Sequence, residues 1–396
     1  MTGVLLLVLA SLATGLGLAN LYSADLTPMG DPGAGFAIQT TRALVALLAF
    51  GIATRLPLEK VREHARLLWL GGVALLVTTW LGGHVAGGAR SWLALGPMHL
   101  QPSELMKVLL PLAIAAELTR PTQRSWAANA LRWLLMHVGV SRPAAAQAGA
   151  VTTRWVIVVG LVAIPLGLVA TQPDMGTAGL LGLTALTVVW LSGVHRRVLV
   201  VGAGAALVAA PVVWSVLQDY QRARIFTFAH PAQDPFGAGY QTLQSLYAVS
   251  SGGWWGRGWG SGTQGRLGFL PEHTTDFILA HLAEEGGLLG ALLCLGLLFA
   301  LITVGLVVAE RARDRFSALL AGALSLSLLW QVAVNAGGIL GLLPLTGVTL
   351  PFFSYGGSSL LAVWFAVGLL TAVARPTVRH RRPTLSPMAP MILKLR

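Results

Sequence analysis

The sequence predicts an all-α, polytopic membrane protein, a helical bundle of about ten transmembrane helices with a large extracytoplasmic loop between helices 7 and 8. Three observations carry this prediction. Of the 396 residues, 55% are hydrophobic and only 11% are charged, and the mean hydropathy is +0.71. Apolar runs of about 20 residues, the length that crosses a bilayer as a helix, recur along the chain. Lys and Arg concentrate in alternate connections between these runs.

Each apolar run is expected to form one helix. The first run has no basic segment before it and no small-residue cleavage site, so it is expected to be retained as a membrane span. The single cysteine, Cys294, lies in the eighth run, so no intrachain disulfide can form. The runs cover residues 3–22, 38–54, 67–84, 104–119, 155–171, 176–194, 198–217, 277–310, 316–342 and 357–374.

The net charge of +12 could indicate a nucleic-acid partner, but its distribution argues against one. The basic residues fall in alternate connections, which the positive-inside rule places in the cytoplasm. Both termini are then cytoplasmic, as an even number of spans requires, and the basic residues can also attract anionic membrane lipid. The basic segments are residues 55–66, 120–154, 196–197, 311–315 and the tail from Arg375.

The remaining connections hold most of the unusual polar residues, so the functional site is expected to face outward. They are residues 23–37, 85–103, 172–175, 218–276 and 343–356. Asp276 requires the most explanation, because it ends the polar segment Pro271-Glu-His-Thr-Thr-Asp276 directly before a long apolar run. A carboxylate at the mouth of a hydrophobic helix is costly unless it has a partner or a task.

Several other polar residues have plain structural interpretations. Ser103 is a candidate helix N-cap, with Glu104 in the first turn. Lys107 lies three residues after Glu104, one turn into an apolar run, so the two can form a structural ion pair. Asp174 is an ordinary turn residue, and Asn335 in an apolar run can bond between helices.

Three further features also have plain interpretations. Trp254, Trp255 and Trp259 fit an aromatic belt at the membrane interface. His273 is a lone histidine without a ligand pattern, so no protein metal site is predicted. The glycines from Gly252 to Gly268 lack the spacing of a nucleotide-binding loop.

Five segments form an ordered set from the first span to the last. They are Gly88-Ala-Arg-Ser-Trp92, Gln101-Pro-Ser-Glu-x-x-Lys107, Gln172-Pro-Asp-x-Gly-Thr177, Leu270-Pro-Glu-His-x-x-Asp276-Phe and Pro351-Phe-Phe-Ser-Tyr-Gly-Gly-Ser-Ser359. Together they resemble the motif set of the SEDS family, which includes FtsW, RodA and SpoVE. One segment departs from the family pattern, since the histidine here directly follows Glu272, whereas Asp276 and Phe277 are kept. Residues 349–359 lean slightly toward FtsW, whereas residues 258–259, 262–264 and 283–285 lean toward RodA.

The resemblance implies a peptidoglycan glycosyltransferase that polymerises lipid II into β1-4 glycan strands at the outer face of the cytoplasmic membrane, during division or elongation. Asp276 would be the general base that accepts the proton of the acceptor sugar's C4 hydroxyl. A departing diphosphate needs cationic stabilisation but no second carboxylate. The cations available on the outer side are Arg90, Lys107, Arg222, Arg224 and Arg257.

A divalent ion, Mg²⁺ or Mn²⁺, could assist the diphosphate, and no organic cofactor is expected. The residues expected to bind substrate are drawn from the motifs and the outer cations. They are Arg90, Gln101, Ser103, Glu104, Lys107, Asp174, Arg222, Arg257, Ser354 and Ser358.

The family resemblance further implies a class B penicillin-binding protein as transpeptidase partner, alongside other membrane proteins of the divisome or elongasome. The chain is expected to comprise a transmembrane glycosyltransferase domain over residues 1–375 and a basic cytoplasmic tail over residues 376–396. Two alternatives stay open: a lipid II flippase or transporter, and a non-enzymatic division scaffold. The ionisable residues lie at the outer ends of spans and no repeat relates the two halves, which favours catalysis over transport.

Overall fold

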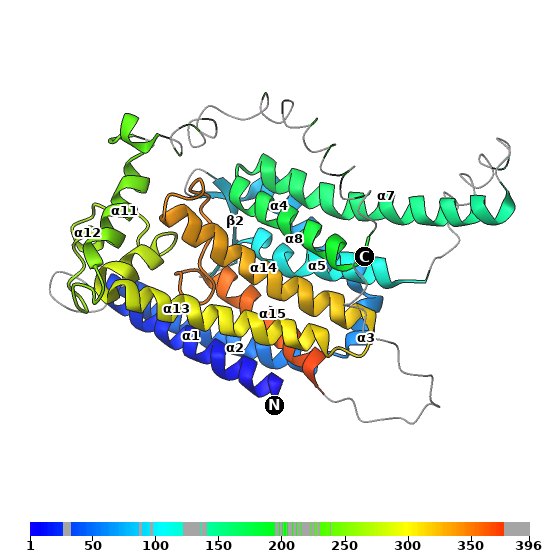
Figure 1. The fold of residues 1–396 in the computed structure, drawn as a ribbon, viewed down its shortest axis with the longest axis horizontal. Helices are drawn as coiled ribbons and strands as arrows, with labels where there is room; N and C mark the ends of the chain where they lie inside the picture. Colours follow the sequence, from blue (N-terminus) through cyan, green and yellow to red (C-terminus); the bar gives the residue numbers. More distant parts are fainter. Residues whose placement is uncertain are drawn as a thin grey trace.

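The computed structural model describes residues 1–26, 33–86, 89–95, 98–121, 141–194, 230–237 and 239–375, together with isolated positions between residues 136 and 228. The fold is a bundle of long helices (Figure 1). The helices are α1 (Thr2–Ala24), α2 (Ala34–Arg55), α3 (Leu58–Glu63), α4 (Ala65–Gly82), α5 (Pro102–Thr119), α7 (Arg142–Thr171), α8 (Met175–Leu191), α11 (Tyr240–Gly252), α12 (Thr263–Arg266), α13 (Ile278–Glu310), α14 (Arg315–Ile339) and α15 (Gly357–Ala374), with a short 3-10 turn at Pro231–Gln233.

Helices α1, α2, α4, α5, α7, α8, α13, α14 and α15 coincide with nine of the predicted apolar runs. Within the described residues, seven segments are long and apolar enough to cross a membrane: α1, α2, α4, residues Val151–Thr171 of α7, α13, α14 and α15. The apolar helix α8 is shorter, with 17 residues. The run predicted at 198–217 and the tail from residue 376 lie largely outside the described residues. A multi-pass helical membrane protein is therefore confirmed.

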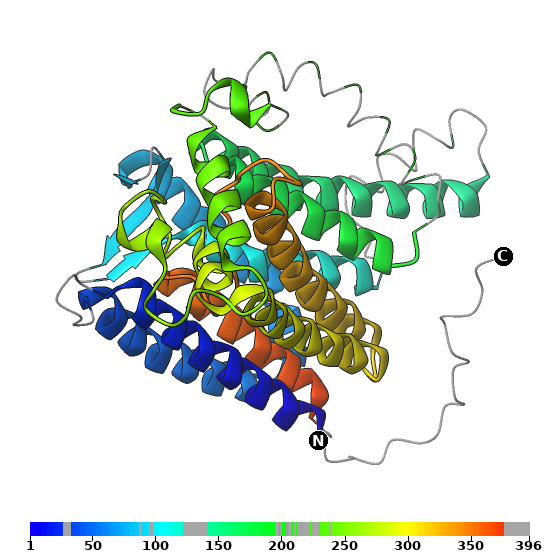
Figure 2. The same cartoon turned by 60° about the vertical axis from the view of Figure 1, so that its left-hand side comes forward.

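The bundle has two distinct ends (Figure 1). At one end, here called the α11 end, lie α11, α12, β2 and the connection from α14 to α15. At the other, the α3 end, lie α3, the N terminus and the connection from α13 to α14. Figure 2 shows the same separation after a rotation of 60°. Two basic connections, residues 55–66 and 311–315, thus share the α3 end, while the polar motifs gather at the α11 end.

Arginines at the α3 end bind the carbonyl groups where helices finish. Arg120 donates to Glu63 O (3.1 Å), and Arg154 donates to Arg120 O (2.8 Å). Arg66 forms an ion pair with Glu117 (2.6 Å). Burial, followed by the charge of Arg66, lowers the pKa of the Arg120 guanidinium. Cations at helix C-termini interact favourably with the helix dipole, so these residues also stabilise the fold.

Helix α5 lies at the centre of the bundle. Fifteen of its 18 residues are buried, and it packs against α4, α7, α8, α14 and α15. Around it, α15 lies on α2, and α13 lies between α1 and α14. The polar residues at the start of α5 are therefore enclosed by other helices.

A small antiparallel sheet precedes α5, where a loop was expected. It consists of β1 (His84–Ala86), β2 (Ala89–Leu95) and β3 (Met98–Leu100), in that order. Glycine-containing pairs at residues 87–88 and 96–97 separate the strands in the sequence, which is the pattern of two tight turns. The prediction was wrong here because short strands beside long apolar runs give a weak periodic signal.

Two buried glutamates near the start of α13 hold the segment before it. Glu284 accepts hydrogen bonds from the backbone N–H of Thr263 (2.7 Å), at the start of α12, and Glu285 accepts one from Gly262 N (3.1 Å). Glu285 also accepts a hydrogen bond from the hydroxyl of Ser23 at the end of α1 (2.5 Å). This network fixes the glycine-rich and tryptophan-rich connection, whose Trp254, Trp255 and Trp259 side chains are exposed.

Candidate functional site

Asp276 lies in a turn directly before α13, and the backbone of this turn is fixed by residues distant in sequence. Tyr355 N donates to Thr274 O (2.8 Å), and the Ser354 hydroxyl donates to Thr275 O (2.6 Å). The Nδ2 group of Asn335, on α14, donates to Asp276 O (2.9 Å). The backbone of the turn that carries the Asp276 carboxylate is therefore held by α14 and by the connection that precedes α15.

Asp276 lines a small cavity at the α11 end, here called the Asp276 cavity. Its volume is about 40 Å³, which holds a few water molecules or one polar substituent of a larger ligand. Among the described residues that line it, Asp276 is the only one with an ionisable side chain. The lining consists of Gln241, Asp276, Phe277, Val334, Asn335, Gly338, Ile339, Leu345, Thr346, Gly347 and Val348.

Residues 345–348 form the wall facing the Asp276 carboxylate. Gly347 has φ +71°, and a Cβ built on it would lie 3.5 Å from Oδ2 of Asp276. Asn335 Nδ2 donates to Val348 O (2.8 Å), so the same amide binds both Asp276 and this wall. The start of α8 also packs closely here, because a Cβ on Gly176 would lie 2.0 Å from Thr346 O.

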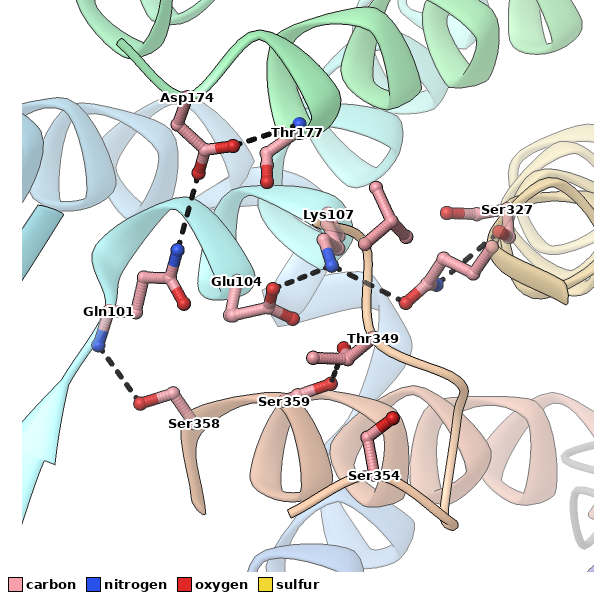
Figure 3. A network of polar contacts seen from close by, with 12 residues as sticks. Gln101, Glu104, Lys107, Asp174, Thr177, Ser327, Thr349, Ser354, Ser358 and Ser359 are labelled. Atoms are coloured by element: carbon pink, nitrogen blue, oxygen red, sulfur yellow. Dashed lines mark hydrogen bonds and ion pairs between the residues drawn. The ribbon is translucent and has the colours of Figure 1, made fainter. Parts of the chain in front are cut away.

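Glu104 and Lys107 form a second polar cluster, inside the bundle (Figure 3). The Lys107 ammonium lies 2.6 Å from Glu104 Oε1 and 3.5 Å from Gln331 Oε1. Both charged side chains are about 95% buried. They line a separate cavity of about 10 Å³ between α5, α14 and α15, and this cavity shares no lining residue with the Asp276 cavity. The expected ion pair is present, whereas the structure does not bring Lys107 to Asp276.

Gln101, Asp174 and Ser358 connect the starts of three helices (Figure 3). Gln101 Nε2 donates to Asp174 Oδ2 (3.2 Å), while Asp174 Oδ1 accepts from Thr177 N (3.1 Å) and so caps α8. Gln101 N donates to the Ser358 hydroxyl at the start of α15 (2.9 Å). These residues fix the α11 end of the bundle, and none of them lines the Asp276 cavity.

The expectation that Ser103 caps α5 is wrong. The helix begins at Pro102 with Gln101 as its N-cap, because proline is favoured in the first helical position. The Ser103 hydroxyl is buried and makes no hydrogen bond to another described residue.

The predicted outer cations are dispersed. Arg90 lies exposed on β2, and Arg257 donates to the Thr263 hydroxyl (2.9 Å) and lies 3.9 Å from Glu284. Arg222 donates to Ser215 O (3.1 Å), and Arg224 lies outside the described residues. None of the described arginines lines the Asp276 cavity.

The described residues do not fit a protein-held metal site, because they contain no group of three or more His, Cys, Asp or Glu side chains that could bind an ion. His273 lies near Asp276 in sequence, but its ring nitrogens lie 3.2 Å from Leu270 O and 3.0 Å from Ala24 O. This histidine connects the turn to the end of α1.

Several residues that complete the Asp276 cavity could not be identified from the sequence. Asn335 was expected to bond between helices, but its amide binds the two loops at the end of α14. Gln241 lies in the outer connection 218–276 but was not predicted as a site residue, and no feature of the sequence predicts the positive φ of Gly347. A buried asparagine at the last turns of an apolar run is a detectable sign that loop carbonyls need a donor.

The chain is similar to known proteins over most of its length. The profile of the FtsW/RodA/SpoVE family, described as "Cell cycle protein", matches residues 3–379. "Peptidoglycan glycosyltransferase MrdB" of Escherichia coli (strain K12) is 39% identical over 332 residues, covering 83% of this chain and 82% of that protein. "Probable peptidoglycan glycosyltransferase FtsW" of Bacillus subtilis (strain 168) is 33% identical, covering 97% and 93%. The chain thus has relatives named MrdB and relatives named FtsW.

Two solved structures share the fold. One is reported as "Structural coordination of polymerization and crosslinking by a peptidoglycan synthase complex", with a TM-score of 0.74 and 30% identity, covering 93% of this chain and 96% of that one. The other is the Rod shape determining protein RodA of Thermus thermophilus, with a TM-score of 0.62 and 28% identity, covering 93% and 95%.

Proposed function

The chain belongs to the FtsW/RodA/SpoVE family and is a membrane-embedded peptidoglycan glycosyltransferase, and from this premise we propose that it polymerises lipid II with Asp276 as general base. The observation that carries the proposal is the Asp276 cavity. Its one ionisable lining residue is a carboxylate whose backbone is fixed from two directions. A general base needs this combination of accessible cavity and fixed position.

The chemistry proposed for Asp276 is a single inverting displacement. Its carboxylate accepts the proton of the C4 hydroxyl of an acceptor N-acetylglucosamine. The C4 oxygen forms a bond with the anomeric carbon of the donor sugar as the bond from that carbon to the lipid-linked diphosphate breaks. Because an α-linked diphosphate is displaced from the opposite face, the product is a β1-4 bond. The diphosphate leaves as an anion and needs no second carboxylate as acid.

The departing diphosphate requires positive charge outside the Asp276 cavity. Of the described outer cations, Arg90 is the one we propose for this role, because it is exposed at the α11 end. Lys107 is enclosed with Glu104, and Arg257 is close to Glu284. With one carboxylate in the cavity, an assisting Mg²⁺ or Mn²⁺ would be bound chiefly by diphosphate oxygens of the substrate.

We also propose that the α11 end faces out of the cell and that both termini are cytoplasmic. The basic connections at the α3 end support this orientation through the positive-inside rule. A class B penicillin-binding protein is the proposed partner, since a structural relative belongs to a synthase complex that couples polymerisation with crosslinking.

The test is a reconstitution of the purified chain with lipid II, alone and with the penicillin-binding protein that co-purifies with it. Glycan strands resolved on a gel are the expected product. A parallel assay with lipid II in one leaflet of a vesicle measures translocation. If lipid II moved between the leaflets and no strands formed even with the partner present, the proposed polymerisation would be contradicted and the chain would instead be a flippase.

A further inference from the structure

Asn335 contributes more to the Asp276 cavity than its two contacts with the backbone. It lies on α14 with 6% of its surface exposed. Its Nδ2 group donates to Asp276 O at 2.9 Å and to Val348 O at 2.8 Å. An amide nitrogen has two hydrogens, so both are used. Since the two partners are carbonyl oxygens, they also fix which amide atom is the nitrogen and which is the oxygen.

The amide oxygen of Asn335 is left without a donor. Oδ1 is buried and accepts no hydrogen bond from the residues that the structure describes. Buried acceptors in native proteins are almost always paired, because an unpaired one loses its bonds to water without replacement. Asn335 lines the cavity that Asp276 also lines. The partner missing from Oδ1 therefore belongs to whatever enters this cavity.

We infer that Asn335 Oδ1 is a substrate-binding acceptor, which receives a hydrogen bond from a hydroxyl or acetamido N–H of the sugar beside Asp276. The inference rests on the proposed function of Asp276. It adds a second protein group that contacts the acceptor sugar and assigns that group a separate task. Asp276 takes the reacting proton, and Asn335 orients the ring by accepting from a neighbouring donor.

The chemistry of the cavity selects a sugar over a phosphate. The Asn335 amide oxygen can only accept, so a group that binds it must supply a hydrogen-bond donor. Sugar hydroxyls and acetamido groups do, whereas a diphosphate is anionic, supplies none at neutral pH and would be repelled by Asp276. The volume of about 40 Å³ admits a substituent and not a whole ring. The cavity is therefore assigned to the acceptor sugar, with the diphosphate of the donor outside it.

Binding is measured in a catalytically silent background. Full-length Asp276→Ala protein in nanodiscs is titrated with lipid II and compared with Asp276→Ala/Asn335→Ala. Because the base is already absent, a further loss reports everything that Asn335 contributes, its two backbone contacts as well as Oδ1, and the structure of the complex described below decides between them. We expect an affinity about 10-fold weaker, the size of one hydrogen bond to a buried group. Ser325→Ala is the matched control, since it removes a buried hydroxyl from α14 that bonds within its own helix (Ser325 Oγ to Ala321 O, 2.8 Å).

The outcomes separate the two claims. Equal affinities, within twofold, for the single and double variants would overturn the role of Asn335 and leave the proposed function intact. Failure of the wild-type protein to polymerise lipid II would overturn the proposed function and this inference with it. A structure of Asp276→Ala bound to lipid II needs no substitution at residue 335. It must show a sugar oxygen or nitrogen within about 3.2 Å of Oδ1; a water molecule there instead contradicts the inference.

Discussion

At the scale of single residues, the site depends on backbone positions more than on side-chain charge. The Asp276 carboxylate faces Gly347, whose φ of +71° is a conformation that other residues adopt at a cost. The amide of Asn335 binds the main chain of Asp276 and that of Val348, next to this glycine. The distance between base and cavity wall is therefore set by a glycine and an asparagine.

Gly347→Ala is predicted to reduce polymerisation through local strain. The left-handed conformation costs an L-residue about 1–2 kcal/mol, and the new methyl group would lie beside the carboxylate. The matched control is Gly193→Ala, at φ +74° after α8, where an added Cβ would have no heavy atom within 4 Å. Both variants should lower the midpoint of thermal unfolding by similar amounts, and only Gly347→Ala should slow strand synthesis. Equal rates of strand synthesis by the two variants would contradict a role of Gly347 in the site.

The sequence was sufficient to identify Asp276 as the residue to explain but insufficient to find its partners. A carboxylate before a long apolar run is visible in one dimension. Asn335 donates to the backbone carbonyl of the aspartate, and Ser354 and Tyr355 donate to the carbonyls of the two preceding residues, although all three lie dozens of residues away in the sequence. Such contacts depend on how α14 and α15 pack against α13, which no local pattern specifies.

At the scale of elements, the long apolar helices could be predicted and their short companions could not. Nine apolar runs coincide with helices because hydropathy and length dominate in a membrane. The β1–β3 sheet and the N-cap of α5 each depend on a few residues, whose local preferences are too weak to be predicted from the sequence. The cluster on α5 shows the same contrast: the spacing of Glu104 and Lys107 predicted their ion pair, but not their enclosure away from Asp276.

The Glu104–Lys107 pair is predicted to stabilise α5 without touching substrate. Glu104→Gln or Lys107→Met alone leaves one charge unpaired in a buried site, which typically costs about 3–5 kcal/mol. Either variant should unfold at lower temperature and polymerise poorly. The double variant Glu104→Gln/Lys107→Met should recover most of the lost stability and activity, because no unpaired charge is left. A double variant with wild-type stability and no activity would instead assign Lys107 to the substrate.

At the scale of the whole molecule, the two ends of the bundle carry different kinds of residue. The α3 end carries basic connections whose arginines bind helix carbonyls, and the α11 end carries the cavity and the motif-bearing connections. Because the two ends lie at opposite ends of the helices, the chain has only two possible orientations in the membrane, one the reverse of the other. Reversing it would put the Asp276 cavity in the cytoplasm, where polymerised glycan could not join the wall.

Thiol labelling tests this orientation in intact cells. A cysteine at the exposed Ser261 should react with an impermeant reagent, and one at Ala145 in α7 should react only after the cells are opened. The parent chain gives a low background because its one cysteine, Cys294, is buried. Labelling at Ala145 but not at Ser261 in intact cells would overturn the proposed orientation and the extracytoplasmic site together.

The role of Asp276 as general base is tested by the purified Asp276→Asn variant. The Asp276→Asn variant keeps the shape of the side chain but cannot accept the proton. The rate at which purified protein, with its partner, converts lipid II into glycan strands should fall by about 10²–10⁴-fold, the usual effect of removing a general base. The thermal unfolding midpoint should stay close to that of the wild type. A well-folded variant that retains more than about a tenth of the wild-type rate would contradict the assignment of Asp276 as the base.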